Sequence, residues 1–426
     1  MSSPASTPEP RREAASDATP DRMASEGSPS DLASAPRSLL AYEKSELTQK
    51  FVELGGKPFH AKIARENVLA KGLLDYELMT SLPRELRARL AVEVPILAGR
   101  EVTRSSARDR TTKLLLEFPR KKERDATVET VHMPAREPKP GLNDDEGWDG
   151  ADDDSPLEED ISVGSGRTDG GSNSRNQPTR PPIARGATLC VSTQVGCPVG
   201  CPFCASGQLG LVRNLEAHEI LEQYVRGAAI GPLGRSVVMG MGEPLLNYAN
   251  LSKALDAVHD EMGLGSRKVT VSTVGFPDRL RALAPQKPRF QLAISLHTPD
   301  QDQRDELVPA MKGVPIEDVL AAGDDWFHKT GREITYEYVL LGRENDTESH
   351  ARRLVERLRG RRCTVNLIPF NPVNESPYRR PDSQDVERFR ATLEQGRVIA
   401  TVRWSRGVES DAACGQLRVR TLNARR

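Results

Sequence analysis

The sequence predicts an α/β protein in which a parallel sheet of six strand–helix units follows a small α+β domain. Three observations support this fold class. Apolar strand segments alternate with helical segments from residue 186 onward, a pattern typical of a parallel sheet. Two stretches, 1–36 and 137–180, are rich in Ser, Pro, Gly and acidic residues and have few apolar side chains to bury. The stretch between them changes from helical to strand-like patterning.

The amino-terminal part is expected to contain one folded domain between two disordered segments. We interpret residues 1–36 as a disordered tail and residues 137–182 as a disordered acidic insertion, because neither composition can form a packed core. Residues 37–136 then form the small domain. Its helices are predicted at 45–54 and 82–92, and its strands at 113–118 and 127–133.

Residues 183–426 are predicted to form the core of the protein. Strands are expected at 187–195, 236–239, 268–273, 290–296, 334–341 and 364–368. Helices are expected at 217–230, 251–262, 277–283, 316–329, 347–358 and 383–395. Such a run folds either as a doubly wound sheet or as a partial barrel. In both architectures the functional site lies at the carboxyl ends of the strands.

The charge distribution favours a basic folded body. The chain has 426 residues and a formal net charge of -1, yet residues 1–36 carry three basic and six acidic residues, and residues 137–180 carry four and twelve. The remainder therefore has a net charge of about +10. This charge is compatible with a polyanionic partner such as nucleic acid, although a solvated basic surface would explain it as well.

The composition favours a cytoplasmic protein without a membrane partner. No stretch of about 18 apolar residues is present to cross a bilayer, and the first ten residues lack the basic and apolar regions of a secretory signal. Six cysteines in a long cytoplasmic chain argue against a disulfide scaffold. Four of them fall between positions 190 and 204, and this clustering is the strongest chemical signal in the sequence.

Three of these cysteines have the spacing of an inorganic centre. Cys197, Cys201 and Cys204 form a C-x3-C-x2-C pattern in a loop that also contains Gly and Pro. A structural zinc site is one alternative, but such sites use four ligands, and the sequence contains no second CxxC or CxxH pair. A 4Fe–4S cluster held by three cysteines leaves one iron free to bind a substrate or cofactor. The spacing therefore favours a cluster that takes part in chemistry.

The cysteine loop, its place after the first core strand, and Phe203 before the last cysteine resemble the radical S-adenosylmethionine (radical SAM) superfamily. Six segments are also similar to those of the RlmN/Cfr family of RNA adenine methyltransferases. They are GATLCVSTQVGC (186–197), RNL (213–215), GMGEPLLNY (240–248), SLH (295–297), NLIPFNP (366–372) and AACGQL (412–417). The similarity covers 186–417 in order and 45–134 more loosely. It implies a partial (β/α)6 barrel for residues 183–426.

The resemblance implies the cofactors and their ligands. Cys197, Cys201 and Cys204 would ligate a 4Fe–4S cluster, whose open iron binds the amino and carboxylate groups of S-adenosylmethionine. The family's other cofactor contacts map onto strand ends in this sequence, at Gly242, Glu243, Ser272, Ser295, His297 and Asn371. Taken alone, Glu243 fits a surface carboxylate and His297 a core histidine. Their positions at successive strand ends favour a ligand role for both.

Cys190 and Cys414 lie in segments where the family has reactive thiols, more than two hundred residues apart. In the mechanism that the resemblance implies, one S-adenosylmethionine methylates Cys414, and a second yields a radical that activates this methyl group for addition to the adenine. Cys190 then attacks the Cys414 sulfur, which releases the product and forms a disulfide. A buried free cysteine is otherwise a small hydrophobe, which is our interpretation of Cys363.

The family also places a glutamate, the proton acceptor for the adenine carbon, in a VETV segment, where this sequence has Glu129. In a strand, Glu129 would share a face with Val131 and Met133. These apolar neighbours predict that Glu129 is buried and that the pKa of its carboxyl is raised, as a base requires. Without the resemblance, Glu129 would be interpreted as an ordinary surface carboxylate.

The implied function is methylation of adenosine at C2 in 23S rRNA, with tRNA as a second candidate substrate and residues 37–136 as an RNA-binding accessory domain. Adenine C8 or another RNA is one alternative. A non-catalytic RNA-binding protein with a structural metal is another, which the presence of both Cys190 and Cys414 disfavours. An electron donor such as flavodoxin and a monomeric state are expected. Three departures from the family's pattern bear on the substrate: no aromatic residues in the helix at 63–72, STVG at 272–275, and the acidic insertion.

Overall fold

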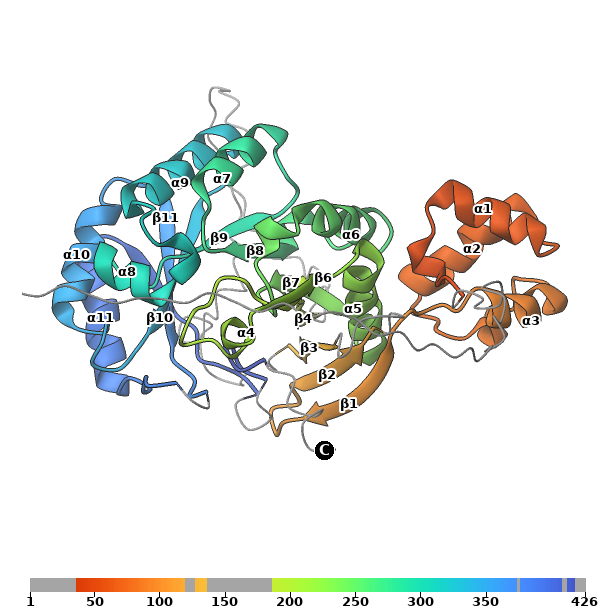
Figure 1. Cartoon of the computed structure of the whole chain (residues 1–426), viewed down its shortest axis with the longest axis horizontal. Helices are drawn as coiled ribbons and strands as arrows, with labels where there is room; N and C mark the ends of the chain where they lie inside the picture. Colours follow the sequence, from red (N-terminus) through yellow and green to blue (C-terminus); the bar gives the residue numbers. More distant parts are fainter. Residues whose placement is uncertain (1–35, 119–126, 136–185, 374–375, 408–411, 418–426) are drawn as a thin grey trace, which may run out of the picture. The chain divides into compact units, whose positions relative to one another are not determined.

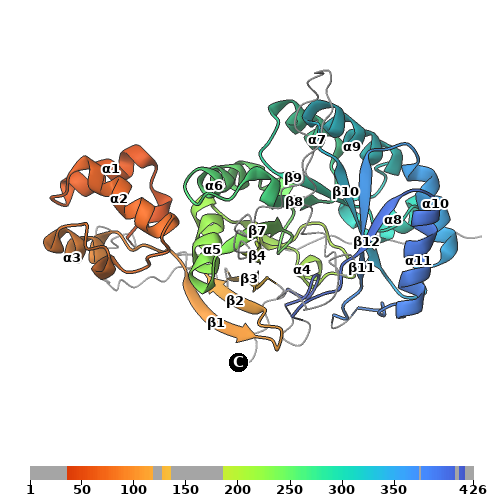
Figure 2. The same cartoon turned by 180° about the vertical axis from the view of Figure 1, so that it is seen from behind.

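The computed structural model describes residues 36–118, 127–135, 186–373, 376–407 and 412–417. The predicted disordered tail, except for Pro36, and the whole predicted insertion lie outside these described residues. Within the described ranges, no helix is both long enough and apolar enough to span a membrane. Figures 1 and 2 show the helices and strands from two opposite sides.

A ten-stranded sheet organises the structure (Figure 1). In spatial order its strands are β1 (Arg100–Ser106), β2 (Thr112–Glu117), β3 (Thr127–Met133), β4 (Ala187–Cys190), β7 (Leu233–Val238), β8 (Val269–Thr273), β9 (Gln291–Ser295), β10 (Ile334–Leu340), β11 (Cys363–Pro369) and β12 (Ile399–Val402). The pairs from β4 to β12 are parallel, and those from β1 to β4 are antiparallel. In the part of the chain that the structure describes, nothing pairs β12 with β1, so the sheet is open. The predicted α/β class is confirmed.

Helices connect the parallel strands and lie along the sheet (Figure 2). They are α5 (Ala217–Ile230), α6 (Tyr248–Asp260), α7 (Pro277–Leu283), α8 (Gln301–Leu307), α9 (Ile316–Thr330), α10 (Glu348–Leu358) and α11 (Ser383–Gln395). A short helix, α4 (Ala205–Gln208), follows the cysteine loop, and a two-stranded hairpin of β5 (Gln194–Gly196) and β6 (Leu211–Asn214) frames that loop. The cysteine loop, which lies between β5 and α4, is therefore near the carboxyl end of β4.

Strand β10 shows how alternate residues of a strand reach the two faces of the sheet. Tyr336 and Tyr338 are buried, and Tyr338 packs on Phe389 of α11 with ring centroids 5.0 Å apart. The intervening Glu337 points to the opposite face, where it lines a cavity. One face of the parallel sheet thus forms the apolar core with the helices, and the other carries polar side chains.

Three helices precede the sheet: α1 (Lys44–Glu53), α2 (Pro58–Leu69) and α3 (Arg84–Glu93). In α2 the buried residues Ala61, Ala64 and Val68 recur three or four positions apart, as one face of a helix requires. Pro58 at the first helical position provides a suitable start, because the amide hydrogen it lacks would have no partner there.

Most predicted elements are confirmed, and the exceptions have physical reasons. The strand expected at 187–195 is divided into β4 and β5, because the main chain leaves the sheet where Thr193 donates its amide to the Met241 carbonyl at 2.8 Å. β1 was not predicted, since its sequence REVTRSS has no apolar alternation, and its burial is low. The four-residue β12 is too short for a periodic signal, and α8, with the sequence QDQRDEL, has a single apolar residue, Leu307.

Candidate active site

A cavity at the carboxyl ends of the parallel strands brings together residues from seven segments of the chain. It is lined by all three cysteines of the loop, by all six predicted cofactor-binding residues and by Cys414. The cofactor-binding set is Gly242, Glu243, Ser272, Ser295, His297 and Asn371. We refer to this as the cluster cavity. The location agrees with the general rule that parallel α/β sheets bind ligands at their strand ends.

The cysteine loop is held in shape by its backbone. The Cys197 amide donates to the Gly210 carbonyl at 2.9 Å, and the Cys204 amide donates to the Cys201 carbonyl at 3.1 Å. Gly196 has a φ of +76°, and a Cβ added there would lie 1.8 Å from the Gly210 oxygen, so only glycine fits. Burial raises the pKa of the Cys197 thiol to about 12 and also raises that of Cys201. The metal-free loop therefore presents neutral thiols, which lose their protons when a metal binds.

Glu243 is buried at the start of a 3-10 turn after β7. One carboxylate oxygen accepts hydrogen bonds from the Thr273 hydroxyl at 2.6 Å and the Leu245 amide at 3.0 Å, and the other accepts from the Val274 amide at 2.9 Å. Burial raises its pKa despite these bonds. The neighbouring Gly242 has a φ of +109° and no room for a side chain. This turn thus holds a carboxylate in one orientation at the cavity wall.

The next two strands contribute hydroxyl and imidazole groups. Ser272 and Ser295 lie 3.4 Å apart between their oxygens, on β8 and at the end of β9. His297 is buried, and its Nδ1 accepts the Val339 amide at 3.2 Å, so the ring is neutral. Burial lowers its pKa to about 3. Phe203, before the last cysteine, packs edge-on against this imidazole with ring centroids 5.0 Å apart.

Several hydrogen bonds hold Cys414 at the cluster cavity. The Asn371 side-chain amide donates to the Cys414 carbonyl at 3.1 Å. On the other side, the Ala205 amide donates to the Gly415 carbonyl and the Ser206 hydroxyl to the Leu417 carbonyl, both at 2.8 Å. Ala205 and Ser206 begin helix α4, directly after the last cysteine of the loop. The segment that carries Cys414 is therefore fastened to the cysteine loop.

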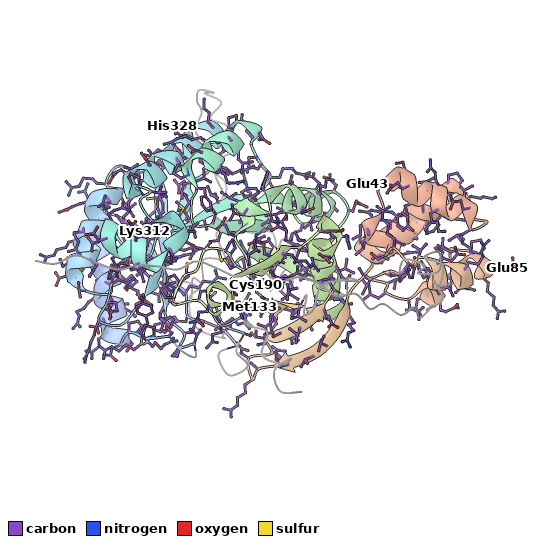
Figure 3. The ribbon with its side chains drawn as sticks, viewed as in Figure 1. Glu43, Glu85, Met133, Cys190, Lys312 and His328 are labelled. Atoms are coloured by element: carbon purple, nitrogen blue, oxygen red, sulfur yellow. The ribbon has the colours of Figure 1, made fainter. Side chains whose placement is uncertain are left out.

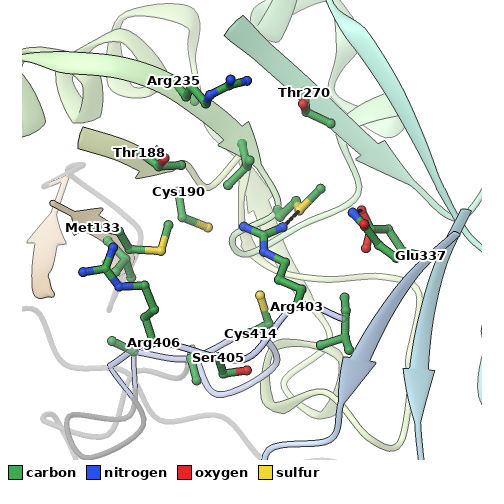
Figure 4. A pocket seen from close by; sticks show the side chains of 18 of the residues that line it. Met133, Thr188, Cys190, Arg235, Thr270, Glu337, Arg403, Ser405, Arg406 and Cys414 are labelled. Atoms are coloured by element: carbon green, nitrogen blue, oxygen red, sulfur yellow. Dashed lines mark hydrogen bonds between the residues drawn. The ribbon is translucent and has the colours of Figure 1, made fainter. Parts of the chain in front are cut away.

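A second cavity, shown in Figure 4, joins Cys190 to Cys414. The two side chains point into it from the end of β4 and from the carboxyl-terminal segment, and Cys414 lines both cavities. We call this second space the thiol cavity. The strand register places Cys190 opposite Val131 of β3, and Met133 lies close by (Figure 3). All six cysteines are free thiols. The fold thus brings together two cysteines that are more than two hundred residues apart.

The comparisons with known proteins agree with this geometry. The Radical SAM superfamily model matches residues 191–355. A probable dual-specificity RNA methyltransferase RlmN from Rhodopirellula baltica is 39% identical over 386 residues, which cover 89% of this chain and 90% of the relative. A relative of the same name from a Synechococcus species is 37% identical, with 89% and 97% covered.

The chain belongs to the RlmN family of radical SAM RNA methyltransferases. A solved radical SAM methyltransferase from Sphaerobacter thermophilus has the same fold, with a TM-score of 0.72 and 35% identity over 90% of this chain and 99% of that one. The superfamily match ends before Asn371 and begins after Cys190, so the paired thiols lie outside it.

The cofactors of a radical SAM protein are a 4Fe–4S cluster and S-adenosylmethionine, and the residues of the cluster cavity suit both. Among the described residues no three His, Cys, Asp or Glu side chains converge as a single metal ion requires. The three thiols of the loop nonetheless face one cavity. A cubane cluster accepts this wider arrangement, because each thiolate binds a different iron. The buried carboxylate of Glu243 is available to an ammonium group.

Glu129 is buried on β3, as its apolar neighbours predict, but it is not among the residues that line either cavity. Its carboxylate forms an ion pair with Lys113 of β2 at 3.1 Å. Its carbonyl accepts the Ser192 hydroxyl at 2.6 Å. Val131 and Met133, which share its face of the strand, do line the thiol cavity. In this structure Glu129 therefore lines neither cavity, and its assignment as a base stays a prediction.

Sequence reasoning missed two charged residues that line the thiol cavity, Glu337 and Arg403. Glu337 on β10 lines both cavities, and its Oε2 is buried without a hydrogen-bond partner. Arg403 follows β12 and reaches into the thiol cavity. A charged residue between Tyr336 and Tyr338 in a strand was the available signal for Glu337. Cys363, expected to pack, begins β11 and lines neither cavity.

Proposed function

We propose that this protein methylates C2 of adenine in 23S rRNA and in tRNA, with Cys414 as the carrier of the methyl group. The observation that carries this proposal is the position of Cys414, which lines both the cluster cavity and the thiol cavity that contains Cys190. A methyl group can be taken up on one side and delivered on the other without transport of the carrier over a long distance. The names of the relatives, dual-specificity RNA methyltransferases, support two kinds of RNA substrate.

When bound by Cys197, Cys201 and Cys204, the cluster would supply the electron that starts radical chemistry on S-adenosylmethionine. The protein's own residues then divide the remaining work. Cys414 takes the methyl group and holds it at the junction of the two cavities. Cys190 displaces the product from the Cys414 sulfur, with a transient disulfide as the result.

Further residues orient the reactants. Glu243 and Asn371 line the cluster cavity with groups suited to the amino acid part of S-adenosylmethionine, and Asn371 also holds the main chain at Cys414. Glu129 accepts the proton of the adenine carbon after a movement that brings it to the thiol cavity. Until then its carboxylate is paired with Lys113.

Several features of the proposal follow from the chain as a whole. Residues 37–136 serve as an RNA-binding accessory domain, supported by the basic character of the chain outside its two acidic segments. An electron donor such as flavodoxin reduces the cluster. The protein acts as a monomer in the cytoplasm.

The choice of C2 over C8 depends on sequence context. The GQLGLVRNL run at 207–215 and the AACGQL segment at 412–417 are closer to RlmN-type enzymes than to the C8-specific relatives. The paired cysteines serve either position equally. C8 methylation is therefore the alternative that the experiment must separate.

The decisive experiment uses the full chain, purified without oxygen and loaded with iron and sulfide. Incubation with S-adenosylmethionine, a reductant and either a 23S rRNA hairpin or a tRNA should yield 2-methyladenosine after nuclease digestion. 8-Methyladenosine as the sole product would overturn the position but leave the mechanism in place. The Cys190→Ala variant should trap a covalent RNA–protein adduct through Cys414, and the Cys190→Ala/Cys414→Ala double variant should trap none. Adduct in the double variant would refute the carrier assignment.

A further inference from the structure

Arg403 is held at the centre of the thiol cavity by its backbone and by its side chain. Its amide donates to the Leu367 carbonyl of β11 at 2.8 Å, which continues the pairing of β12. Its guanidinium donates to the Met239 sulfur at 3.4 Å. Figure 4 shows this guanidinium between Cys190 and Glu337, above Cys414. The main chain of Arg403 is therefore held by β11, and its guanidinium is held by the residue that follows β7.

Cys190 must become a thiolate in a buried position before it can attack Cys414. It is only 7% exposed, and burial raises the pKa of its thiol to about 12, with Cys414 acting in the same direction. Only a thiolate attacks sulfur at a useful rate, and a buried anion is costly unless a positive charge lies nearby. Arg403 is the cation whose charge favours the thiolate of Cys190.

Four other charged residues line the thiol cavity: Arg235, Lys268, Glu337 and Arg406. Lys268 ends the 3-10 turn directly before β8. Arg406 donates to the Pro134 carbonyl and forms an ion pair with Asp109 at 3.4 Å. Arg235 lies at the far end of the cavity beside Thr188 (Figure 4). Glu337 lies on the other side of Arg403, and burial raises the pKa of its carboxyl although the guanidinium acts in the opposite direction.

We propose that Arg403 is a positioning residue for product release: its guanidinium supplies the positive charge against which Cys190 becomes a thiolate and attacks Cys414. This inference rests on the proposed function, because it assigns a residue to the last step of that reaction. Arg403 does not exchange a proton or touch the base in this step. It acts through Cys190.

The step conserves atoms and electrons. The Cys190 proton leaves to solvent, and an S–S bond forms between Cys190 and Cys414. The bond between the Cys414 sulfur and the methylene group on the adenine breaks, and its electron pair passes to the methylene carbon, which takes up a proton and becomes the product methyl group. The two sulfurs lose two electrons in total, and the carbon gains them.

The test compares Arg403→Met and Arg403→Lys with the unmodified enzyme, and uses Arg235→Met as a control for a cation removed from the same cavity. Three quantities are measured by mass spectrometry and gel shift: methylated Cys414, the covalent RNA–protein adduct, and released methylated RNA. Arg403→Met should form methylated Cys414 normally and accumulate at least tenfold more adduct than the unmodified enzyme. Arg403→Lys should accumulate less than Arg403→Met, and Arg235→Met should accumulate none in excess.

The rate of adduct release is also measured as a function of pH, because a purely structural effect of the substitution would not change this dependence. The thiolate fraction of Cys190 rises about tenfold per pH unit below its pKa, so release of the adduct in Arg403→Met should accelerate with pH. A uniform loss of methylated Cys414 and adduct would overturn the inference, as would normal release. If Arg403→Met fails to bind iron and sulfide, Arg403→Lys decides the question. Adduct in Cys190→Ala but not in Arg403→Met would reject this inference alone, whereas no adduct in either variant would reject the proposed function.

Discussion

Replacement of Gly242 by alanine tests whether this glycine is required by the fold itself or only by the approach of a cofactor. Its φ of +109° is unfavourable for any residue with a Cβ, which costs about 1–3 kcal/mol. The added Cβ would also lie 2.7 Å from the Gln194 Cβ and the Thr193 hydroxyl. Relief of such overpacking typically costs about 1–3 kcal/mol. We therefore expect Gly242→Ala to lose about 2–6 kcal/mol of unfolding free energy.

The assay is denaturant unfolding of the metal-free protein, with Gly263→Ala as the matched control. Gly263 has a φ of +75°, but no atom lies within 4 Å of the position that an added Cβ would take, so only the backbone cost of about 1–2 kcal/mol applies. In addition, Gln194 accepts the Glu243 amide at 2.7 Å, so its displacement should weaken S-adenosylmethionine binding in the loaded enzyme. Equal stability of the two variants would refute the packing argument.

Three further predictions concern the reactive groups. Single replacement of Cys197, Cys201 or Cys204 by alanine should abolish the visible absorbance of the cluster and the cleavage of S-adenosylmethionine, and full cleavage in any variant would contradict the ligand assignment. Alkylation of Cys190 in the metal-free protein should accelerate about tenfold per pH unit through the alkaline range, because burial keeps this thiol protonated up to a pKa of about 12; a rate that levels off near pH 9 would show that its surroundings were misjudged. Glu129→Gln should slow methylation of RNA while methylated Cys414 still forms, and unchanged RNA methylation would remove Glu129 from the reaction.

Most of the parallel part of the fold was predictable because most of its elements, β12 and α8 excepted, carry their own periodic signal. Helices α5, α7 and α11 begin and end where the sequence predicts, since their apolar stripes are regular and their ends are marked by Gly, Pro or polar residues. The edge strand β1 was not predictable, because an exposed strand needs no apolar alternation. Its place in the sheet is decided by pairing with β2, which is a tertiary contact.

The site residues also fall into a group that the sequence predicted and a group that it did not. Residues within motifs, such as Glu243 and Asn371, were located by the local sequence, and the structure places them in one cavity. Glu337 and Arg403 lie in no recognisable motif. Their position at the thiol cavity could not be predicted, because it depends on the pairing of β10 and β12 with the two sides of β11. For Glu129 the sequence identified the residue but not its contacts. Its segment was recognisable, but the ion pair with Lys113 depends on strand register.

The hydrogen bonds from Ala205 and Ser206 to the main chain around Gly415 give the cysteine loop a second duty. Helix α4 starts at Ala205, directly after Cys204, so the residues that bond to the main chain around Gly415 adjoin the last cysteine of the loop. A cluster bound through Cys204 would thereby also restrain the segment that presents Cys414, so that one binding event steadies both the cofactor loop and the carrier thiol. Hydrogen exchange of residues 412–417 should accordingly slow when iron and sulfide are incorporated.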